Sequence, residues 1–499
     1  MSDLDNKIIN ATKWSAIAEI IAKLITPITN MILARIIAPE EFGVIATITM
    51  IISFADMFTD AGFQKYLIQH EFESEEFRTQ SINVAFWTNL VISIFLWIVI
   101  AIFSEQIATM VGIPSLGYVI SLACIQLPLT SFSSIQMAIY RRSFDFKTLF
   151  SVRLAGICIP FIVTIPLALL GYSYWSLIIG TICGTLANAI ILTIKSPWKP
   201  QKIYKISVLK KMISFSIWSL IESLSIWLTN WIDTFIIASA LSSYYLGVYN
   251  TSLTVVNSIF MLVTASTTSI LFSALSRVQN DERQFNSIFL SMQRSIAYLV
   301  IPMSIGIYIY SDVVVKILLG DKWVEASSVI GVWGLISGIT IVLGHYSSEI
   351  YRAKGKPKLS FLAQMIHLAV LVPICILSSK HGFMTLVNNR ALVRLQLVLT
   401  HMIILRYIIG ISIKSILMNV YIPCIASIIM GLFGMILRSI SNSLIWQLSS
   451  IFMCILFYIL VLMIIKVSRE DIKKFINKII IRNNFSKNFK LINTINRVE

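Results

Sequence analysis

The 499-residue chain has few charged side chains. Asp, Glu, Lys and Arg together make up only 13% of the residues, whereas 57% are hydrophobic and the mean hydropathy is +0.82. A water-soluble domain of this composition would expose large apolar surfaces and aggregate. The shortage of charge therefore excludes a soluble protein and predicts a membrane protein.

Several chemical signatures are also absent. The sequence has no GxxxxGK[ST] phosphate loop and no HExxH, which excludes ATP hydrolysis by this chain and a zinc protease site. All six cysteines lie in apolar segments and form no CxxC, which argues against disulfides and metal sites; they are Cys124, Cys158, Cys183, Cys375, Cys424 and Cys454. No polar loop between apolar runs exceeds about 20 residues, too short for an extramembrane catalytic domain. We predict that the protein is not an enzyme and needs no cofactor.

Long apolar runs fill most of the chain, and each has about the 20 residues that a membrane-spanning helix needs. They lie at residues 14–37, 43–63, 82–104, 117–140, 149–170, 173–194, 212–240, 246–274, 293–319, 324–350, 360–379, 384–409, 415–437 and 444–466. The first run contains Glu19 and Lys23 and lacks a small-residue cleavage site, unlike a signal peptide. The sequence predicts an all-α, polytopic membrane protein with about fourteen transmembrane helices.

The basic residues alternate between loops, which gives the topology. Lys and Arg should collect in cytoplasmic loops, and with a cytoplasmic N-terminus 32 of the 40 do. Outer loops hold only Arg35, Lys316, Lys322, Lys380 and Arg438, while Lys23, Arg390 and Arg394 lie inside runs. The net charge of +16 therefore reflects topology rather than nucleic-acid binding, and both termini are predicted to be cytoplasmic.

The two halves of the chain resemble each other. A shift of 204 residues aligns Trp14 with Trp218, Ala34 with Ala238 and Gly43 with Gly247, and a shift of 211 aligns residues 139–141 with the identical residues 350–352. Six helices per repeat preserve orientation, so the halves would be related by a pseudo-two-fold axis along the membrane normal. We predict an N-terminal lobe (1–195), a C-terminal lobe (196–410), two extra helices (411–467) and a basic cytoplasmic tail (468–499).

Two segments resemble a known family. Residues 33–43 (LARIIAPEEFG) are similar to the link between its first two helices, and residues 60–63 (DAGF) with 67–69 (LIQ) are similar to its helix-two exit. The family is the Wzx-type polysaccharide flippases of the multidrug and oligosaccharidyl-lipid exporter superfamily. At the start of the twelfth helix the chain departs from the family's Gly-rich pattern, with Gly382 followed by Phe383 and Met384.

The resemblance implies two six-helix lobes around a cavity in a bacterial plasma (inner) membrane. It implies export of a polyprenyl-diphosphate-linked oligosaccharide to the outer leaflet for O-antigen, capsule, exopolysaccharide or teichuronic acid. The partners would be this lipid-linked substrate, membrane lipids, H⁺ or Na⁺, and a polysaccharide polymerase with its chain-length regulator.

Cations inside the spans are the candidate substrate-binding residues. A charge within a spanning helix usually faces a cavity or a partner, and the planar fork of arginine suits a phosphate. The candidates are Lys23, Arg35, Arg390 and Arg394. Alternative interpretations are an intrahelical pair of Lys23 with Glu19, interfacial snorkelling of Arg35, and a surface position for Arg390 and Arg394 if their helix starts later.

Carboxylates inside the spans are the candidate ion-coupling residues. Asp56, Asp233 and Glu19 could take up a proton or Na⁺ and so couple transport to an ion gradient. Asp60 shares a helix face with Asp56, but capping or pairing near the cytoplasmic interface is the favoured explanation for it.

Three other functions remain open. A polysaccharide polymerase or glycosyltransferase would need a sizeable extramembrane loop or a surface acidic cluster. A multidrug exporter of the same superfamily would have mainly acidic cavity residues. A lipid II flippase would work in nearly the same way as an oligosaccharide flippase.

Overall fold

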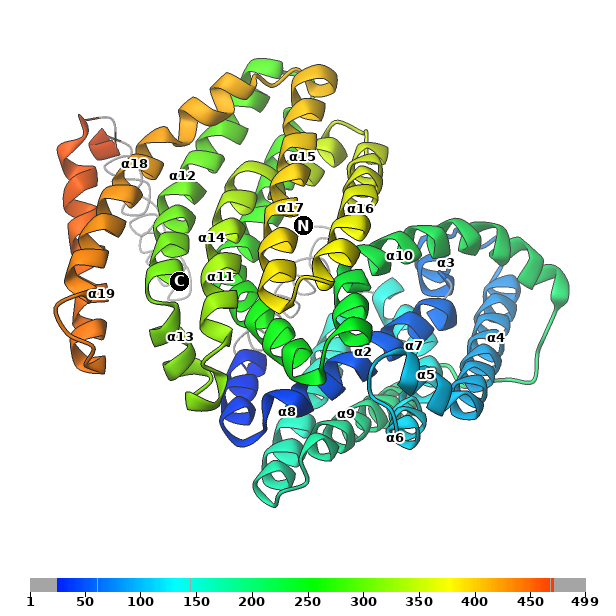
Figure 1. Ribbon diagram of the computed structural model, residues 1–499. Coiled ribbons are helices and arrows are strands. Elements are labelled where there is room, and N and C mark those ends of the chain that lie inside the picture. Colours follow the sequence, from blue (N-terminus) through cyan, green and yellow to red (C-terminus); the bar gives the residue numbers. More distant parts are fainter. Residues whose placement is uncertain (1–24, 61, 144, 467, 471–499) are drawn as a thin grey trace, which may run out of the picture. The chain divides into compact units, whose positions relative to one another are not determined.

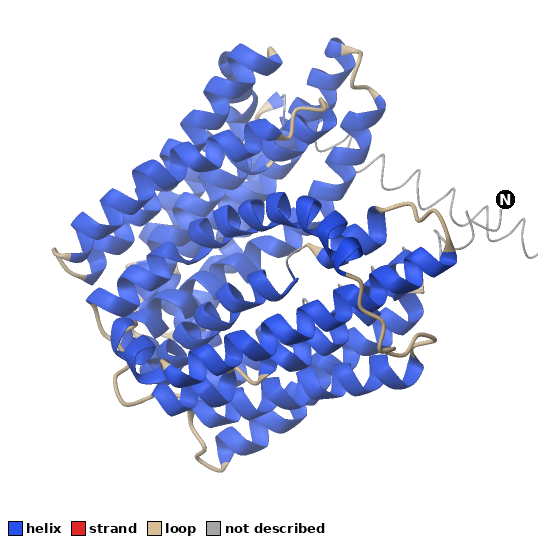
Figure 2. Cartoon of the chain, turned by 90° about the vertical axis from the view of Figure 1, so that its right-hand side faces the viewer, coloured by secondary structure: helices blue, strands red, loops and turns tan. Residues whose placement is uncertain are grey.

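The computed structural model describes residues 25–60, 62–143, 145–466 and 468–470. Within these residues all regular elements are helical and no strand occurs, as Figure 2 shows. The predicted all-α fold is therefore confirmed for the described part of the chain. Glu19 and Lys23 lie outside it.

Figure 1 labels the helices in chain order, beginning after an unlabelled helix, Ile25–Ile36. The elements that follow are α2 (Pro39–Asp60), α3 (Phe63–Gln69), α4 (Glu75–Ile102), α5 (Ser104–Met110), α6 (Gly117–Ala123), α7 (Gln126–Arg142), α8 (Phe146–Leu169), α9 (Tyr174–Lys195), α10 (Ile206–Ala240), α11 (Ser243–Arg277), α12 (Glu282–Ile309), α13 (Ser311–Leu318), the 3₁₀ turn η1 (Asp321–Trp323), α14 (Ala326–Thr340), the π-helical turn η2 (Ile341–His345), α15 (Ser347–Ala353), α16 (Lys358–Ser379), α17 (Phe383–Ile404), the π-helical turn η3 (Leu405–Ile409), α18 (Ile413–Arg438) and α19 (Leu444–Ile464).

The described residues contain 12 helices that are long and apolar enough to cross a membrane. The other two predicted runs also fall on helices: run 14–37 is described from residue 25 as Ile25–Ile36, and run 212–240 lies in the 35-residue α10. Run 293–319 was predicted as one segment, but α12 ends at Ile309 and α13 begins at Ser311. The chain is a multi-pass membrane protein, and the count of fourteen spans stays a prediction.

Short polar side chains start several of these helices. Ser74, Asp145, Asp281 and Ser443 each accept a hydrogen bond from the backbone N–H three residues later, at the N-termini of α4, α8, α12 and α19. Such caps satisfy amide groups that have no partner within the helix. The polar residues between the apolar runs therefore decide where these spans begin.

The chain forms two compact units. Unit 1 comprises residues 1–262, 314–333 and 357–400, and unit 2 comprises residues 263–313, 334–356 and 401–499. Unit 1 thus joins the whole predicted N-terminal lobe to parts of the predicted C-terminal lobe. The division into two six-helix lobes stays a prediction.

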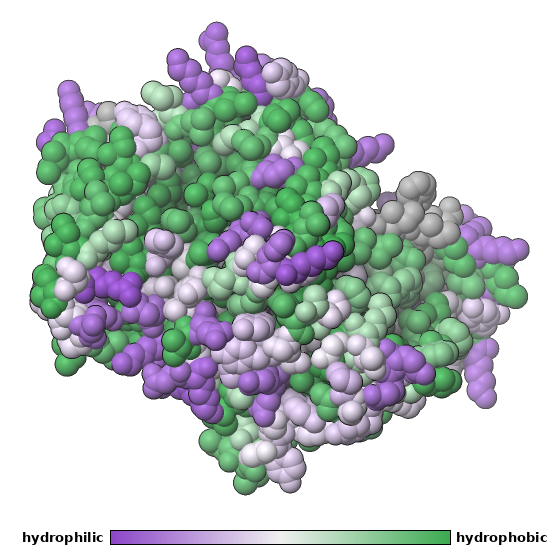
Figure 3. Space-filling model, in the orientation of Figure 1, coloured by the Kyte–Doolittle hydropathy of each residue, from purple (hydrophilic) through white to green (hydrophobic). Residues whose placement is uncertain are grey.

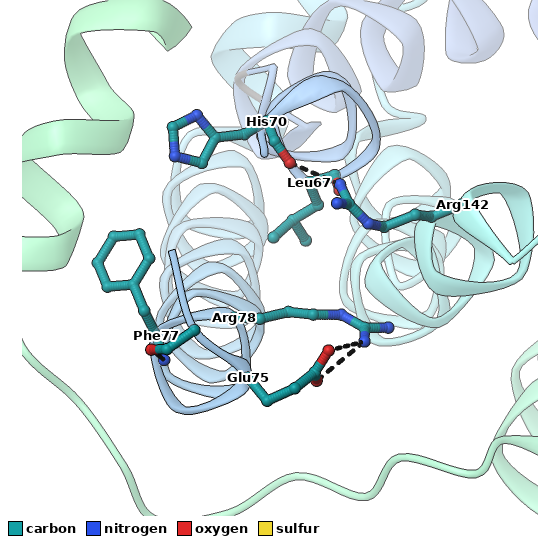
Figure 4. A network of polar contacts seen from close by, with 7 residues as sticks. Leu67, His70, Glu75, Phe77, Arg78 and Arg142 are labelled. Atoms are coloured by element: carbon teal, nitrogen blue, oxygen red, sulfur yellow. Dashed lines mark hydrogen bonds and ion pairs between the residues drawn. The ribbon is translucent and has the colours of Figure 1, made fainter. Parts of the chain in front are cut away.

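In unit 1, an arginine of α7 holds the end of α3 (Figure 4). Arg142 donates to the carbonyl oxygens of Leu67 (2.8 Å), Ile68 (3.2 Å) and His70 (2.7 Å), and its guanidinium carbon lies 4.8 Å from the ring centroid of Phe72. These carbonyls have no helical partners of their own, and a cation at a helix C-terminus also opposes the helix dipole. The helix-two exit that resembles the flippase family is therefore fixed by Arg142.

Unit 2 is joined by polar contacts between apolar helices. The Asn419 amide on α18 donates to the Leu290 carbonyl (2.6 Å) and to Gln293 Oε1 (3.0 Å) on α12, and it accepts from Arg294 Nε (2.9 Å). On α19, Ser450 Oγ donates to the hydroxyl of Tyr310 (3.0 Å), which follows α12. Side-chain hydrogen bonds of this kind hold membrane helices together where lipid removes the hydrophobic driving force.

Large apolar side chains are exposed on the long helices. On α18 and α19, Leu432, Ile445 and Ile464 are 57%, 81% and 82% exposed. Figure 3 shows large areas of one face as hydrophobic, with hydrophilic residues gathered in groups. Such a surface is stable in contact with lipid, in accordance with a membrane protein.

Candidate functional site

A buried ion pair links two spanning helices of unit 1. Arg390 on α17 donates through Nε to Asp233 Oδ2 on α10 at 2.8 Å, and the two side chains are only 9% and 4% exposed. The helix α17 begins at Phe383, so Arg390 lies two turns inside it and the predicted twelfth helix is confirmed. Sequence analysis placed the two residues in different roles, and the structure brings them together.

Further hydrogen bonds saturate the carboxylate. The Tyr249 hydroxyl on α11 donates to Asp233 Oδ2 at 2.7 Å, and the Thr234 backbone N–H donates to Oδ1 at 2.8 Å. A buried charge pair repays its desolvation only when its remaining lone pairs and protons are also satisfied. Asp233 is therefore well compensated as an anion.

The arginine is less completely satisfied than the carboxylate. Arg390 Nη1 is buried and has no hydrogen-bond partner among the described residues. Its guanidinium carbon lies 5.5 Å from the Trp333 ring centroid, and that of Arg394 lies 4.6 Å from the same ring. An indole face attracts cations, most strongly where water is excluded. The two arginines thus lie on one helix face and contact one aromatic ring. The Nη1 donor of Arg390 has no partner among the described residues.

Polar side chains also connect α17 with α16. His367 Nδ1 on α16 lies 3.1 Å from Gln396 Oε1, and Gln396 Nε2 donates to the Thr400 hydroxyl at 2.8 Å. Together, Asp233, Tyr249, Trp333, His367, Arg390, Arg394 and Gln396 form what we term the charge cluster. It holds one anion and two cations within apolar helices, and such groups mark substrate or ion pathways.

Sequence analysis missed Tyr249, Trp333 and His367. Residues 233, 249, 333 and 390 have no helical spacing, so no sequence pattern relates them. The only signal of a shared site was that a charge inside a spanning helix needs a partner. Only the packing of α10, α11, α14, α16 and α17 brings these residues together.

The other predicted site residues lie elsewhere. Asp56 is half-buried on α2, and Arg35 is exposed and donates to the Ile317 carbonyl; neither is bonded to the Asp233–Arg390 pair. Glu19 and Lys23 lie outside the described residues. The substrate-binding role of the four cations and the coupling role of the three carboxylates stay predictions.

A second feature of unit 1 is a set of contacts that we call the link clamp, formed by residues 34–36 and 42 with residues 317, 322 and 323. Arg35 Nη2 donates to the Ile317 carbonyl (2.6 Å), Lys322 Nζ to that of Ile36 (3.0 Å), and Trp323 Nε1 to that of Ala34 (2.7 Å). The acceptors belong to C-terminal turns of helices, which lack helical partners and attract cations. Arg35 therefore caps the C-terminus of α13, and Lys322 and Trp323 cap the C-terminus of the helix Ile25–Ile36.

Two glycines that correspond in the repeat lie beside the link clamp. A Cβ atom on Gly43 of α2 would overlap the Ser243 carbonyl, and one on Gly247 of α11 would overlap the Pro39 carbonyl. In the repeat with an offset of 204 residues, Gly43 corresponds to Gly247 and Pro39 corresponds to Ser243. The two contacts are therefore reciprocal. Reciprocal contact between equivalent residues is what a two-fold axis produces. The starts of α2 and α11 thus touch backbone to backbone.

The repeat extends to the neighbouring loop. A shift of 211 residues converts Gly112 into Trp323. A Cβ on Gly112 would overlap the Ala238 carbonyl, while Trp323 donates to the carbonyl of Ala34, which corresponds to Ala238. The same helix end is therefore contacted in both halves, once by backbone and once by an indole. The symmetry of the complete lobes stays a prediction.

A cavity of about 580 Å³ lies in unit 1 beside the link clamp. Its lining is mainly apolar, with a polar strip on α11; the polar lining residues are Asn30, Thr49, Asn250, Thr251, Thr254 and Ser258. Amides and hydroxyls on apolar walls are typical of sites that orient a neutral ligand. Arg35, Arg390 and Arg394 are not among the lining residues.

No metal site is evident in the described ranges, where no three His, Cys, Asp or Glu side chains group together.

Solved structures identify the fold. The lipid II flippase MurJ, in an inward closed conformation, superposes with a TM-score of 0.73 and 16% identity over 90% of this chain and 98% of MurJ. An inward-facing multidrug transporter of the MOP superfamily superposes with a TM-score of 0.61 and 11% identity over 79% of this chain and 97% of the transporter. The protein therefore has the fold of these transporters.

The family follows from the sequence. The model of the polysaccharide biosynthesis protein family matches residues 32–328, and the chain belongs to this family. A membrane protein of the cps region in Klebsiella pneumoniae is 24% identical over 75% of this chain and 76% of its own length. The lipopolysaccharide biosynthesis protein WzxC of Escherichia coli K12 is 22% identical over 84% and 85%. The succinoglycan biosynthesis transport protein ExoT of Rhizobium meliloti is 24% identical over 65% of both chains.

Removing Asp233 should destabilise the protein far more than removing both partners of its ion pair. Asp233→Ala leaves the Arg390 guanidinium buried without a counterion, and we expect a loss of about 3–5 kcal/mol. The double variant Asp233→Ala/Arg390→Met should recover much of this loss because no unpaired charge remains. Thermal unfolding of the purified protein in detergent measures each variant. Strictly additive losses would mean that the two residues are not coupled.

Gly43→Ala should separate the starts of α2 and α11. The new Cβ overlaps a backbone carbonyl, which cannot rotate away as a side chain can, so we expect a cost of about 1–3 kcal/mol, as for overpacking. The matched control is Gly306→Ala in α12, where a Cβ meets no atom within 4 Å; alanine there should be neutral or stabilising by up to about 1 kcal/mol. Equal melting temperatures of the two variants would contradict the close backbone contact.

Proposed function

We propose that the protein is a flippase for a polyprenyl-diphosphate-linked oligosaccharide. It moves this lipid from the cytoplasmic to the outer leaflet for synthesis of O-antigen, capsule, exopolysaccharide or teichuronic acid. The main support for this proposal is that a chain of the polysaccharide biosynthesis family has, over 90% of its length, the fold of a lipid flippase. The relatives WzxC and ExoT, named for lipopolysaccharide biosynthesis and succinoglycan transport, support the substrate class.

The proposed mechanism is alternating access. The link clamp, which lies in predicted outer loops, would hold the outer side closed while the substrate is taken up. The Asn and Thr side chains of the cavity suit sugar hydroxyls, and the predicted cations Lys23, Arg35, Arg390 and Arg394 suit the diphosphate. Opening of the clamp would break three side-chain hydrogen bonds to helix ends, which keeps the energy difference between states small.

Ion coupling is the second part of the proposal. Asp233 is bound to Arg390 and Tyr249, so a proton or Na⁺ on this carboxylate would compete directly with the arginine. Neutralising Asp233 would free Arg390 for a phosphate, which links ion uptake to substrate binding. Asp56 and Glu19 are further candidates for the same role.

The proposed location is the bacterial plasma membrane, with both termini in the cytoplasm. Basic loop clusters such as Lys195 to Lys211 support this orientation. A polysaccharide polymerase and its chain-length regulator would take up the exported oligosaccharide on the outer side.

One alternative has a specific observation in its favour. The superposition with MurJ fits a lipid II flippase as well as an oligosaccharide flippase, because the fold does not distinguish the attached sugars. A polymerase, a glycosyltransferase and a multidrug exporter have less support, since the family and its relatives belong to polysaccharide biosynthesis and transport.

The decisive test is the leaflet distribution of polyprenyl-diphosphate-linked oligosaccharide in vesicles with and without the protein. We expect outer-leaflet substrate only when the protein is present, and a rate about 10- to 150-fold slower for Arg394→Ala, because loss of one charge-assisted hydrogen bond costs about 1.5–3 kcal/mol. Lys380→Ala, at an exposed position, serves as control and should transport normally.

Two outcomes would change the assignment. If lipid II crosses and the oligosaccharide lipid does not, the lipid II alternative replaces the proposal. If the oligosaccharide crosses without the protein but stays unpolymerised, the polymerase alternative replaces the proposal.

Ion coupling has its own measurement. Vesicles with an imposed pH or Na⁺ gradient should transport faster than vesicles without one, and Asp233→Asn should abolish the acceleration while leaving gradient-independent exchange. Asp233→Asn retains the shape of the side chain but cannot change its charge. An undiminished acceleration in this variant would move the coupling site elsewhere, with Asp56→Asn as the next variant.

A further inference from the structure

The segment between α9 and α10 is fixed along the outside of α4. The Gln201 backbone N–H donates to Asn83 Oδ1 (2.7 Å), and its carbonyl accepts from Trp87 Nε1 (2.8 Å). At the next residue of α4, the hydroxyls of Thr88 and Tyr204 are 3.1 Å apart. An irregular segment with exposed polar residues such as Gln201 and Lys202 belongs at headgroup depth, since lipid would leave its remaining backbone groups without partners. Residues 83–88 of α4 therefore lie at the membrane interface, where Trp and Tyr are enriched.

A groove of about 410 Å³ opens at this place. It is lined by Trp87, Thr88, Val91, Ile92, Lys202 and Tyr204. Lys202 is exposed and has no carboxylate partner among the described residues. Thr88 and Tyr204 have one hydroxyl proton each, and the hydrogen bond between them uses only one of the two. The other proton is left as a donor beside Lys202. One end of the groove thus presents a cation and a hydroxyl, and the other presents apolar side chains.

An apolar stripe continues from the groove along α4. Val91, Phe95, Ile98 and Ile102 are 62%, 63%, 46% and 67% exposed, and their spacing puts them on one helix face. The stripe is about 16 Å long at 1.5 Å per residue. One leaflet contributes about half of the 30 Å hydrocarbon core. The stripe therefore has the length of one leaflet and starts at the polar end of the groove.

Of the exposed lysines in this segment, Lys202 lines the groove, whereas Lys205 and Lys210, which are also exposed, are not among its lining residues. Among its neighbours, Lys195 donates to Ser151 Oγ (3.1 Å), Lys199 donates to the Thr193 carbonyl, and Lys211 lies over the Phe77 ring at 5.0 Å. The remaining basic charge of the segment adds to the local positive potential. Charge and shape together select a ligand with an anionic head and an acyl chain.

We propose that this groove binds one anionic phospholipid. The phosphate contacts Lys202 Nζ and the free hydroxyl proton of the Thr88–Tyr204 pair, and an acyl chain lies along Val91, Phe95, Ile98 and Ile102. A free phosphate would use only the polar end, and a zwitterionic lipid would bring a second, repelling cation to Lys202. The proposal requires a membrane-spanning α4 but does not depend on what the protein transports.

Native mass spectrometry of the delipidated full chain, titrated with phosphatidylglycerol, tests the site. We expect one tightly retained lipid, and about five-fold weaker binding for Lys202→Gln, as expected for one lysine at an anionic surface. The matched control is Lys147→Gln, at an exposed lysine in the first turn of α8, which should bind as the original protein does. Phosphatidylcholine and inorganic phosphate should neither bind with this stoichiometry nor compete.

A second pair of variants tests the apolar part without a change of charge. Val91→Trp fills the groove and should abolish the retained lipid, whereas Ile190→Trp, on the exposed surface of α9, should not. Equal effects of Lys202→Gln and Lys147→Gln would mean general charge attraction and would overturn the proposal. So would retention in Val91→Trp, competition by inorganic phosphate, or preferential binding of a polyprenyl diphosphate.

Discussion

A charge inside a membrane-spanning helix must have a partner within the protein, and this constraint organises unit 1. Asp233 and Arg390 are nearly fully buried on different helices, and each would cost several kcal/mol alone in lipid. Their pairing requires Asp233 and Arg390 to lie at the same depth in the membrane, with α10 and α17 each rotated about its axis so that the two side chains face each other. Tyr249 and Trp333 then have to come from α11 and α14 to complete the environment. A single electrostatic requirement thus relates the neighbouring helices α10 and α11 to the distant helices α14 and α17.

Backbone groups impose a similar requirement at the helix ends. The carbonyls of Ala34, Ile36 and Ile317 have no helical partners, and side chains from the opposite half of the chain cap them. Beside them, Gly43 and Gly247 allow α2 and α11 to touch without intervening side chains. Hydrogen bonds to carbonyls can be exchanged for water at little net cost. A closure made of such contacts holds firmly in one state and can still open, as alternating access requires.

The charge cluster and the lipid groove use cations in opposite ways. In the cluster, the buried Arg390 is neutralised by Asp233, and in the proposed mechanism it becomes available to a phosphate only when that carboxylate changes its charge. In the groove, Lys202 is exposed at headgroup depth and is available at all times. The first arrangement suits a transported substrate that must bind and leave. The second suits a structural lipid that stays.

The sequence alone determined the all-α fold, the places of the spanning helices and the family, because about 20 apolar residues and alternating basic loops have few other solutions in a bilayer. It also identified Asp233, Arg390 and Arg394 as unusual, since charges in such runs are costly. Only the tertiary structure decided that Asp233 pairs with Arg390, that Tyr249, Trp333 and His367 join them, and that Gly43 meets Gly247. Periodicity specifies which face of a helix is apolar, but the facing helix is chosen by packing over the whole chain, which no local pattern encodes.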